Sequence, residues 1–119
     1  MSYDGVEKRK NLRIGTNLIV SYRQATEKDL TDISQTKNIG LGGAMFKTKK
    51  EFPVGTNLML EIRLPQENVP FMFIGKVMGS KQVIKDLCYD TRIEFLSVNE
   101  TQKNAINALI NYLSKKDDS

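Results

Sequence analysis

The sequence predicts a mainly β domain, a closed antiparallel barrel or sandwich, followed by one C-terminal helix. Apolar residues alternate with polar ones in several short segments between residues 12 and 96, which is the period of a strand. After residue 97 the apolar spacing changes to that of an amphipathic helix. Several short strands separated by Gly- and Pro-containing turns are typical of barrels and sandwiches. With 119 residues, of which 39% are hydrophobic, the chain has the size and apolar content of one domain.

Six strand segments are expected from these patterns. The four residues 40–43 include three glycines and predict a turn or bulge before the third segment. Gly79 and Ser80, with the polar residues after them, are expected to separate the last two segments. The expected strands lie at residues 12–23, 30–38, 44–46, 58–64, 71–78 and 87–96.

A helix is expected at about residues 98–115. Ser97 and Glu100 have the spacing of a capping box at its start. Its polar face carries asparagines rather than a row of Lys and Arg, so we expect its apolar face to cover the open end or side of the barrel and not a membrane. The residues of the apolar stripe are Ile106, Leu109, Ile110 and Leu113.

Residues 1–11 are polar and charged and are expected to form a flexible N-terminal arm ahead of a single domain at 12–116. The arm lacks the apolar region of a signal peptide, and no apolar run approaches the ~20 residues that cross a bilayer. The single cysteine, Cys88, suits a reducing compartment and is expected to be a structural thiol in a strand. These features predict a cytoplasmic location without membrane insertion.

The composition argues against most enzyme classes. The chain has no His, which is the commonest general base and the commonest metal ligand, and one cysteine cannot form a metal knuckle. It also lacks the Walker loop of phosphate-binding enzymes, the GxSxG nucleophile elbow of hydrolases and the HExxH motif of zinc proteases. A catalyst built from carboxylates or lysines stays open, but we expect a protein that is not an enzyme and uses no cofactor and no metal.

Two local motifs stand out against this background. Arg9 and Arg13 form an RxxxR pair, with Lys8 and Lys10 beside it. Residues 38–43 read Asn-Ile-Gly-Leu-Gly-Gly. Taken separately, the basic pair is typical of a solvated tail and the glycine run is typical of a turn or bulge.

Together, in this order and on this strand pattern, the motifs resemble those of the PilZ domain, the bacterial receptor module for the second messenger cyclic di-GMP. The family pattern is RxxxR followed by [D/N]xSxxG, on a six-stranded antiparallel β-barrel with a C-terminal helix. Arg9 and Arg13 fit the first motif, while Asn38, Gly40 and Gly43 fall on the second. The resemblance continues through residues 44–46, 54–56, 58–64, 75–77 and 92–95.

The resemblance implies that these five residues bind cyclic di-GMP, with Lys8, Lys10 and Arg92 as further contacts. Arginine suits this ligand, because its planar guanidinium pairs with phosphate oxygens or with guanine O6 and N7 and stacks on a base. The amide of Asn38 offers an acceptor to a guanine N–H, and Gly43 would let the ligand approach bare backbone.

The family usually has Ser where this chain has Gly40, so one hydroxyl is missing from the second motif. A lost neutral hydrogen bond is typically worth about 1 kcal/mol, so weaker binding is expected rather than none. A competing register through Asp32 and Ser34 fails, because Lys37 stands where the motif requires Gly.

Three functions follow in order of preference. The first is a cyclic di-GMP receptor whose arm folds over the ligand and relays the signal to a partner protein by a conformational change. The second is a PilZ-fold adaptor for pilus or motility machinery that binds no nucleotide. The presence of Gly40 where the family usually has Ser favours this second function. The third is a barrel that binds single-stranded nucleic acid, for which a net charge of +4 is low. For that third role Phe71, Phe73 and Phe95 would form the stacking platform, although core positions are the stronger expectation. Separately, Lys47, Lys49 and Lys50 could extend an anion-attracting surface, but a solvated loop is the stronger expectation.

Overall fold

The structure is a computed structural model that describes residues 13–26, 31–67 and 69–118, with side chains described from residue 14 to residue 113 within these ranges. The expected arm at 1–11, with Lys8, Arg9 and Lys10, lies outside the described residues. The elements are β1 (Arg13–Gly15), β2 (Ile19–Gln24), β3 (Asp32–Gly40), β4 (Gly43–Thr48), β5 (Asn57–Ile62), β6 (Phe71–Ile84), β7 (Cys88–Phe95) and α2 (Glu100–Asp118).

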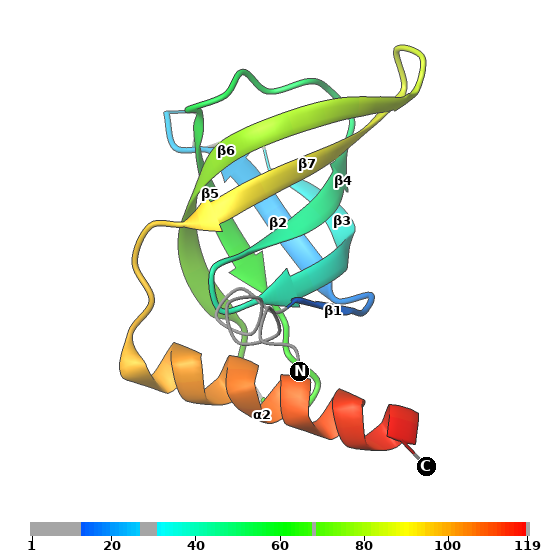
Figure 1. The fold of residues 1–119 in the computed structure, drawn as a ribbon. Coiled ribbons are helices and arrows are strands. Elements are labelled where there is room, and N and C mark those ends of the chain that lie inside the picture. Colours follow the sequence, from blue (N-terminus) through cyan, green and yellow to red (C-terminus); the bar gives the residue numbers. More distant parts are fainter. Residues whose placement is uncertain (1–12, 27–30, 68, 119) are drawn as a thin grey trace, which may run out of the picture.

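The strands form one closed antiparallel barrel (Figure 1). The order β1-β3-β2-β5-β6-β7-β4 is closed by the pairing of β3 with β4. β1 and β2 follow one another along β3, since Arg13 pairs with Gly40 and Ile19 pairs with Gln35. These two segments are therefore the halves of one interrupted strand, and the predicted six-stranded barrel with a helix is confirmed.

The side chain of Thr36 bridges the gap between β1 and β2. The hydroxyl of Thr36, which is buried, accepts a hydrogen bond from the backbone N–H of Leu18 at 2.9 Å and donates to the carbonyl of Thr16 at 2.7 Å. Backbone bonds continue beside them, since Thr16 N–H donates to the Lys37 carbonyl at 3.1 Å and Thr36 N–H donates to the Leu18 carbonyl at 2.8 Å. The sequence predicts one continuous strand at 12–23 because the alternation of apolar residues does not reveal this side-chain bridge.

The apolar positions of the alternating segments point into the barrel. The largest buried side chains include Phe46, Phe73 and Ile93, and full burial of such a side chain contributes roughly 1.5–3 kcal/mol. Phe73 and Phe95 stack with ring centroids 4.3 Å apart, so the aromatic residues weighed as a nucleic-acid platform are mainly core. Phe71 is half-buried against the same core.

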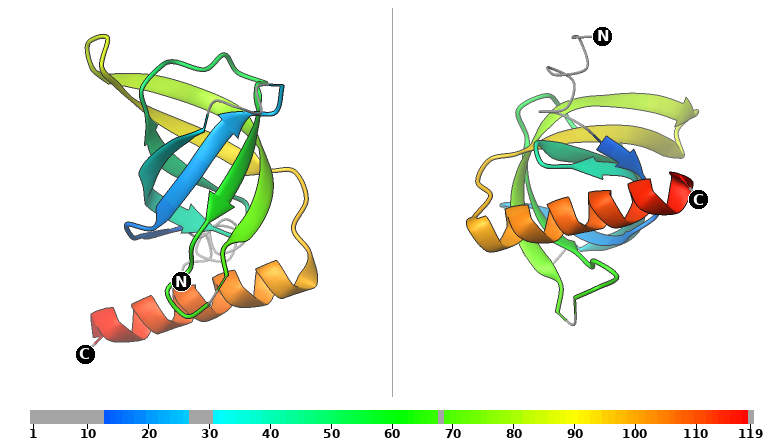
Figure 2. Two further views of the ribbon diagram at one scale, coloured as in Figure 1. Left: turned by 180° about the vertical axis from the view of Figure 1, so that it is seen from behind. Right: turned by 60° about the horizontal axis from the view of Figure 1, so that its bottom comes forward.

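α2 lies across one end of the barrel (Figures 1 and 2). Ile106, Leu109 and Ile110 are buried there and Leu113 packs against them, which confirms the predicted stripe. The side-chain amide of Gln102 donates to the carbonyl of Met72 in β6 at 2.7 Å and fixes the helix to the barrel. Among the described residues, no helix combines the length and the apolar character that a membrane span requires.

The helix begins at Glu100 and its cap differs from the predicted one. Asn99 Oδ1 accepts a hydrogen bond from the backbone N–H of Gln102 at 2.8 Å, and Gln102 Oε1 accepts one from the N–H of Asn99 at 3.0 Å. This reciprocal pair is a capping box. The prediction that placed it at Ser97 and Glu100 is wrong by two residues, because the contact of Gln102 with β6 selects the later register.

The predicted break at Gly79 and Ser80 is also wrong, because β6 runs through both residues. A register shift between Val77 and Gly79 places a bulge at Met78 inside the strand. The hairpin formed by β6 and β7 consequently projects beyond the rest of the barrel (Figure 1). Asp86 in its turn has a φ of 61°.

Candidate functional site

Strand pairing brings the two sequence motifs together. Arg13 in β1 is the Cα partner of Gly40 in β3, and Gly15 is the partner of Asn38. The backbone of the second arginine of RxxxR therefore lies beside the Asn-x-Gly part of the other motif. The side chain of Arg13 lies outside the described residues, as does all of Arg9.

A bulge in β3 turns two adjacent side chains toward the outside of the barrel. The register of β3 against β4 shifts between Thr36 and Asn38. Thr36 and Ile39 point inward and are buried, while Lys37 is exposed and Asn38 is half-buried. In a regular strand neighbouring side chains lie on opposite faces, so the bulge is what lets Lys37 and Asn38 share the outer surface.

Asn38 presents an acceptor that is not used. Its Oδ1 atom is buried and accepts no hydrogen bond within the described part of the chain. A buried acceptor without a donor costs about 1–3 kcal/mol. Native proteins satisfy most such groups, so this oxygen fits a ligand that supplies an N–H.

Arg92 lies in the same row of residues across the barrel wall. Asn38 is the Cα partner of Met45 in β4, and Met45 is the partner of Arg92 in β7. Two strand spacings separate Asn38 from Arg92, roughly 10 Å. Arg92 Nη2, however, lies 3.8 Å from the position of a Cβ at Gly79 in β6, on the side of β7 away from Asn38. The structure thus places Arg92 in the row but does not bring its guanidinium to Asn38.

The two glycines of the second motif have different surroundings. Gly40 is buried at the end of β3, where its backbone pairs with β1. Gly43 begins β4, and a Cβ there would clash with the carbonyl oxygen of Ile93 in β7. Close packing of two strands is thus a sufficient reason for glycine at 43, independent of any approach by a ligand.

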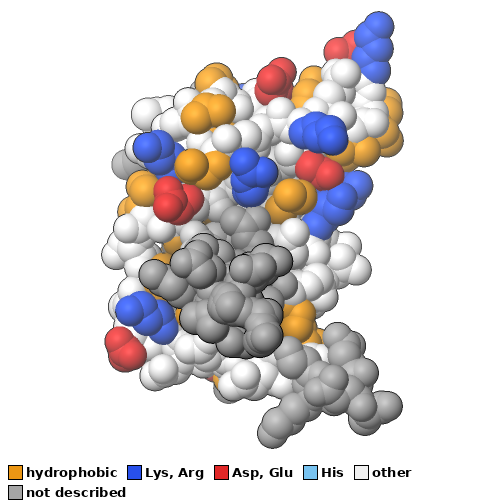
Figure 3. All heavy atoms as spheres, viewed as in Figure 1, with side chains coloured by type: hydrophobic (Ala, Val, Ile, Leu, Met, Phe, Trp, Pro, Cys, Tyr) orange, Lys and Arg blue, Asp and Glu red, His pale blue; other side chains and the backbone are white. Residues whose placement is uncertain are grey.

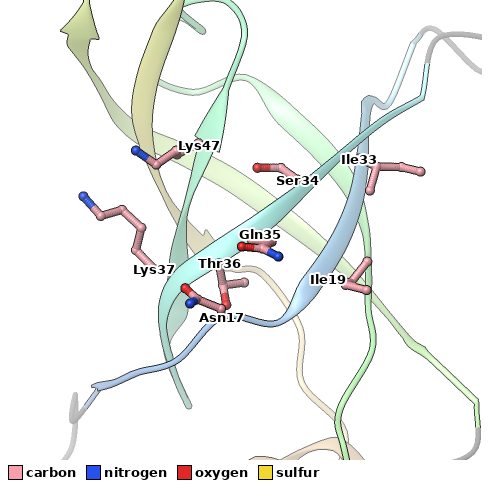
Figure 4. Close-up of a pocket in the computed structure, with 8 residues that line it drawn as sticks. All are labelled: Asn17, Ile19, Ile33, Ser34, Gln35, Thr36, Lys37 and Lys47. Atoms are coloured by element: carbon pink, nitrogen blue, oxygen red, sulfur yellow. The ribbon is translucent and has the colours of Figure 1, made fainter.

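The structure shows a hollow of about 470 Å³ on the outside of β2, β3 and β4, lined by Lys37, the chain neighbour of Asn38, but not by Asn38 itself (Figure 4). The amines of Lys37 and Lys47 lie at one end of it, away from Ile19 and Ile33. Lys47 belongs to β4, so its predicted place in a solvated loop is wrong. The residues that line the hollow are Asn17, Ile19, Ile33, Ser34, Gln35, Thr36, Lys37 and Lys47.

An ion pair joins this region to β7. Lys37 Nζ lies 2.9 Å from Asp90 Oδ2, and the exposed fractions of the two side chains are 43% and 17%. Asp90 Oδ1 is buried and has no hydrogen-bond partner in the described residues. Sequence reasoning missed Lys37 and Asp90 as a pair because 53 positions separate them and no short pattern connects them.

The face of the barrel that carries β6 and β7 is mixed in charge. Figure 3 shows Lys and Arg side chains at several separate places on it, with acidic and hydrophobic side chains between them. This distribution differs from the continuous basic groove with which proteins bind a nucleic-acid backbone.

Several solved structures share the fold. The chain matches the motility inhibitor MotI (DgrA) of Bacillus subtilis with a TM-score of 0.71 and 20% identity, covering 88% of this chain and 51% of that one. It matches the PilZ domain of YcgR from Escherichia coli, solved with c-di-GMP, with a TM-score of 0.61 and 20% identity over 91% and 95% of the two chains.

A third match is PlzA of Borreliella burgdorferi, solved in complex with c-di-GMP, with a TM-score of 0.59, 12% identity and coverage of 95% and 55%. At these identities the likeness concerns the fold, and the chain spans about half the length of the MotI and PlzA chains. No curated protein matches the chain.

The family comparison gives a match over most of the chain. The model of the PilZ domain matches residues 7–112, which is most of the sequence and includes Arg9, Arg13 and the 38–43 segment. The chain therefore belongs to the PilZ domain family.

Proposed function

We propose that this protein is a receptor for cyclic di-GMP and that it binds the ligand on the outer face of the barrel, between the end of the N-terminal arm and Asn38. The pairing of Arg13 with Gly40 carries this proposal, because it places the arm motif and the Asn-x-Gly-x-x-Gly motif side by side. Two relatives of the same fold, YcgR and PlzA, were solved with c-di-GMP.

The chemistry of the ligand matches the residues assembled here. A guanine carries N–H donors on its Watson–Crick edge, which complement the unused acceptor of Asn38. Its phosphodiesters are anionic, and the guanidinium groups of Arg9 and Arg13 bind such groups in a bidentate manner. Gly40 supplies no hydroxyl, so its contribution is limited to its backbone.

Binding is the chemistry that we propose, without turnover. The arginines of the arm close on the ligand and change the surface that the protein presents to a partner protein. Hydrogen–deuterium exchange measures this step directly. The backbone amides of residues 1–12 should exchange more slowly when the ligand is bound.

Calorimetric titration with cyclic di-GMP tests the binding step, with cyclic di-AMP and GTP as control ligands. Arg9→Ala and Arg13→Ala should each weaken binding by roughly tenfold or more, since each removes a charge-assisted contact. Arg63→Ala, which removes an exposed arginine after β5, is the matched control and should bind as the wild type does.

The competing function is a PilZ-fold adaptor that binds no nucleotide. The replacement of the usual Ser by Gly40 is the observation that favours it. Absence of heat and of any shift in melting temperature with excess cyclic di-GMP would support the adaptor and refute the receptor.

A further inference from the structure

We propose that Lys37 and Lys47 form a phosphate subsite next to Asn38, and that the carboxylate of Asp90 holds Lys37 until a ligand phosphate replaces it. This inference rests on the proposed binding of cyclic di-GMP. It adds two lysines to the site that the RxxxR and Asn-x-Gly-x-x-Gly motifs do not include.

The first support is position. Because of the bulge in β3, Lys37 shares the outer surface with Asn38, its neighbour in the chain. A nucleotide that donates from its guanine to Asn38 therefore lies on the same face as the Lys37 ammonium. Lys47 lines the same end of the hollow (Figure 4).

The second support is the local balance of charge. Asp90 is the Cα partner of Lys47 in β4 and of Lys81 in β6, and it forms its ion pair with Lys37 from β3. One carboxylate thus has three lysines as ion-pair partner or cross-strand neighbours. Within the described part of the chain Lys47 makes no ion pair, so its ammonium is available to an anion.

The third support is the shape of the hollow. Ile19 and Ile33 stand at the end away from the two amines, with 51% and 71% of their surfaces exposed, and they offer an anion no contact. A phosphate bound in this hollow is therefore fixed at the lysine end. A ribose or a base face suits the apolar end, and a nucleotide combines both parts.

Asp90 acts in this arrangement as an internal competitor. Its Oδ2 occupies the position at Lys37 that a phosphate oxygen would take, while its Oδ1 lacks a donor. A second anion next to this carboxylate meets repulsion, and salt screens such interactions between partly exposed groups. Removal of the Asp90 charge should consequently help the ligand, whereas removal of the Lys37 charge should hinder it.

Calorimetric titration of four variants with cyclic di-GMP tests these opposite effects on the affinity. Lys37→Met should bind roughly ten- to a hundredfold more weakly, as for loss of a hydrogen bond to a charged group. Lys47→Met should bind roughly two- to fivefold more weakly and Asp90→Asn roughly two- to fivefold more tightly, the range of an exposed charge pair. Lys103→Met, which removes an exposed lysine on α2, should match the wild type.

The same variants provide a second readout. The affinity of Lys37→Met should fall less steeply with added salt than that of the wild type. Circular dichroism and melting temperature establish that each variant is folded. A wild type that binds, together with a Lys37→Met affinity within twofold of it or an Asp90→Asn that binds more weakly, would overturn the subsite while the receptor function stands.

A wild type without heat would instead overturn the receptor function, and inorganic pyrophosphate then tests the subsite separately. Shifts of the amide NMR signals of Lys37 and Lys47 with pyrophosphate would support it. Signals that do not move at these positions would refute it.

Discussion

Inside the barrel, the end covered by α2 is filled by apolar side chains such as Ile106 and Leu109, and the nearby polar groups of Gln102 are paired. On the outer face at the bulge of β3, the oxygens Asn38 Oδ1 and Asp90 Oδ1 are buried without a donor in the described residues. The first region contributes free energy of folding, whereas the second retains unsatisfied oxygens, of which Asn38 Oδ1 is the one that the proposed ligand would satisfy.

This difference indicates that stability and binding reside in separate parts of a small domain. Substitutions inside the barrel should lower the free energy of unfolding and leave the affinity of folded molecules unchanged. Substitutions on the outer face should change the affinity for the ligand without lowering the free energy of unfolding. The following variants test how strict that division is.

Ile106→Ala should have the largest effect on stability. Ile106 is fully buried where α2 meets the barrel, and removing such a side chain typically lowers the free energy of unfolding by about 2–5 kcal/mol. Urea denaturation measures the change. Asn107→Ala, at the exposed neighbouring position, is the control and should stay within about 0.5 kcal/mol of the wild type.

Gly43→Ala should lower the free energy of unfolding by about 1–3 kcal/mol, because the new methyl group meets the carbonyl of Ile93. Gly79→Ala is the matched control, since a Cβ there lies at an ordinary 3.8 Å from Arg92. If Gly43→Ala reduced cyclic di-GMP affinity without loss of stability, the glycine would serve the ligand and the division between the regions would fail at this position.

Asn38→Ala should raise the free energy of unfolding by about 1 kcal/mol, because it removes an unsatisfied buried oxygen. The same variant should lose binding of cyclic di-GMP by roughly tenfold or more. Thr36→Ala, two residues away, should instead lower stability, since it deletes the two hydrogen bonds that bridge β1 and β2. A stability loss in Asn38→Ala would contradict the comparison.

Substitution of Tyr22 should have the smallest effect on the free energy of unfolding, and only at alkaline pH. Burial raises the pKa of Tyr22 above its usual value of 10.0, although a hydrogen bond with the Lys49 backbone partly opposes this shift. The unfolded chain then loses the proton at lower pH than the folded chain. Stability is complete below about pH 10 and declines as the pH rises toward the folded pKa.

Thermal unfolding between pH 8 and 11 measures this decline. Tyr22→Phe should flatten it, because phenylalanine has no hydroxyl to titrate. An unchanged slope in Tyr22→Phe would show that another group causes the alkaline loss.

Much of the fold could be predicted because local patterns and tertiary structure agree. The alternation at 58–64 corresponds to β5, and the i, i+3, i+4 spacing from Ile106 corresponds to the buried face of α2. The predicted element boundaries are wrong where contacts with other strands, and not the local sequence pattern, determine the structure. Thr36 interrupts the first strand, Gln102 selects the helix cap, and a bulge carries β6 through Gly79.

The sequence by itself determined the β-barrel class, the C-terminal helix and the residues of the two motifs, because hydrophobic periodicity and short motifs are local properties. Only the tertiary structure decided that Arg13 lies opposite Gly40, that Lys37 shares a face with Asn38, and that Lys37 meets Asp90. Barrel closure and a single-residue bulge set these neighbours, and neither is encoded in the spacing of residues along the chain.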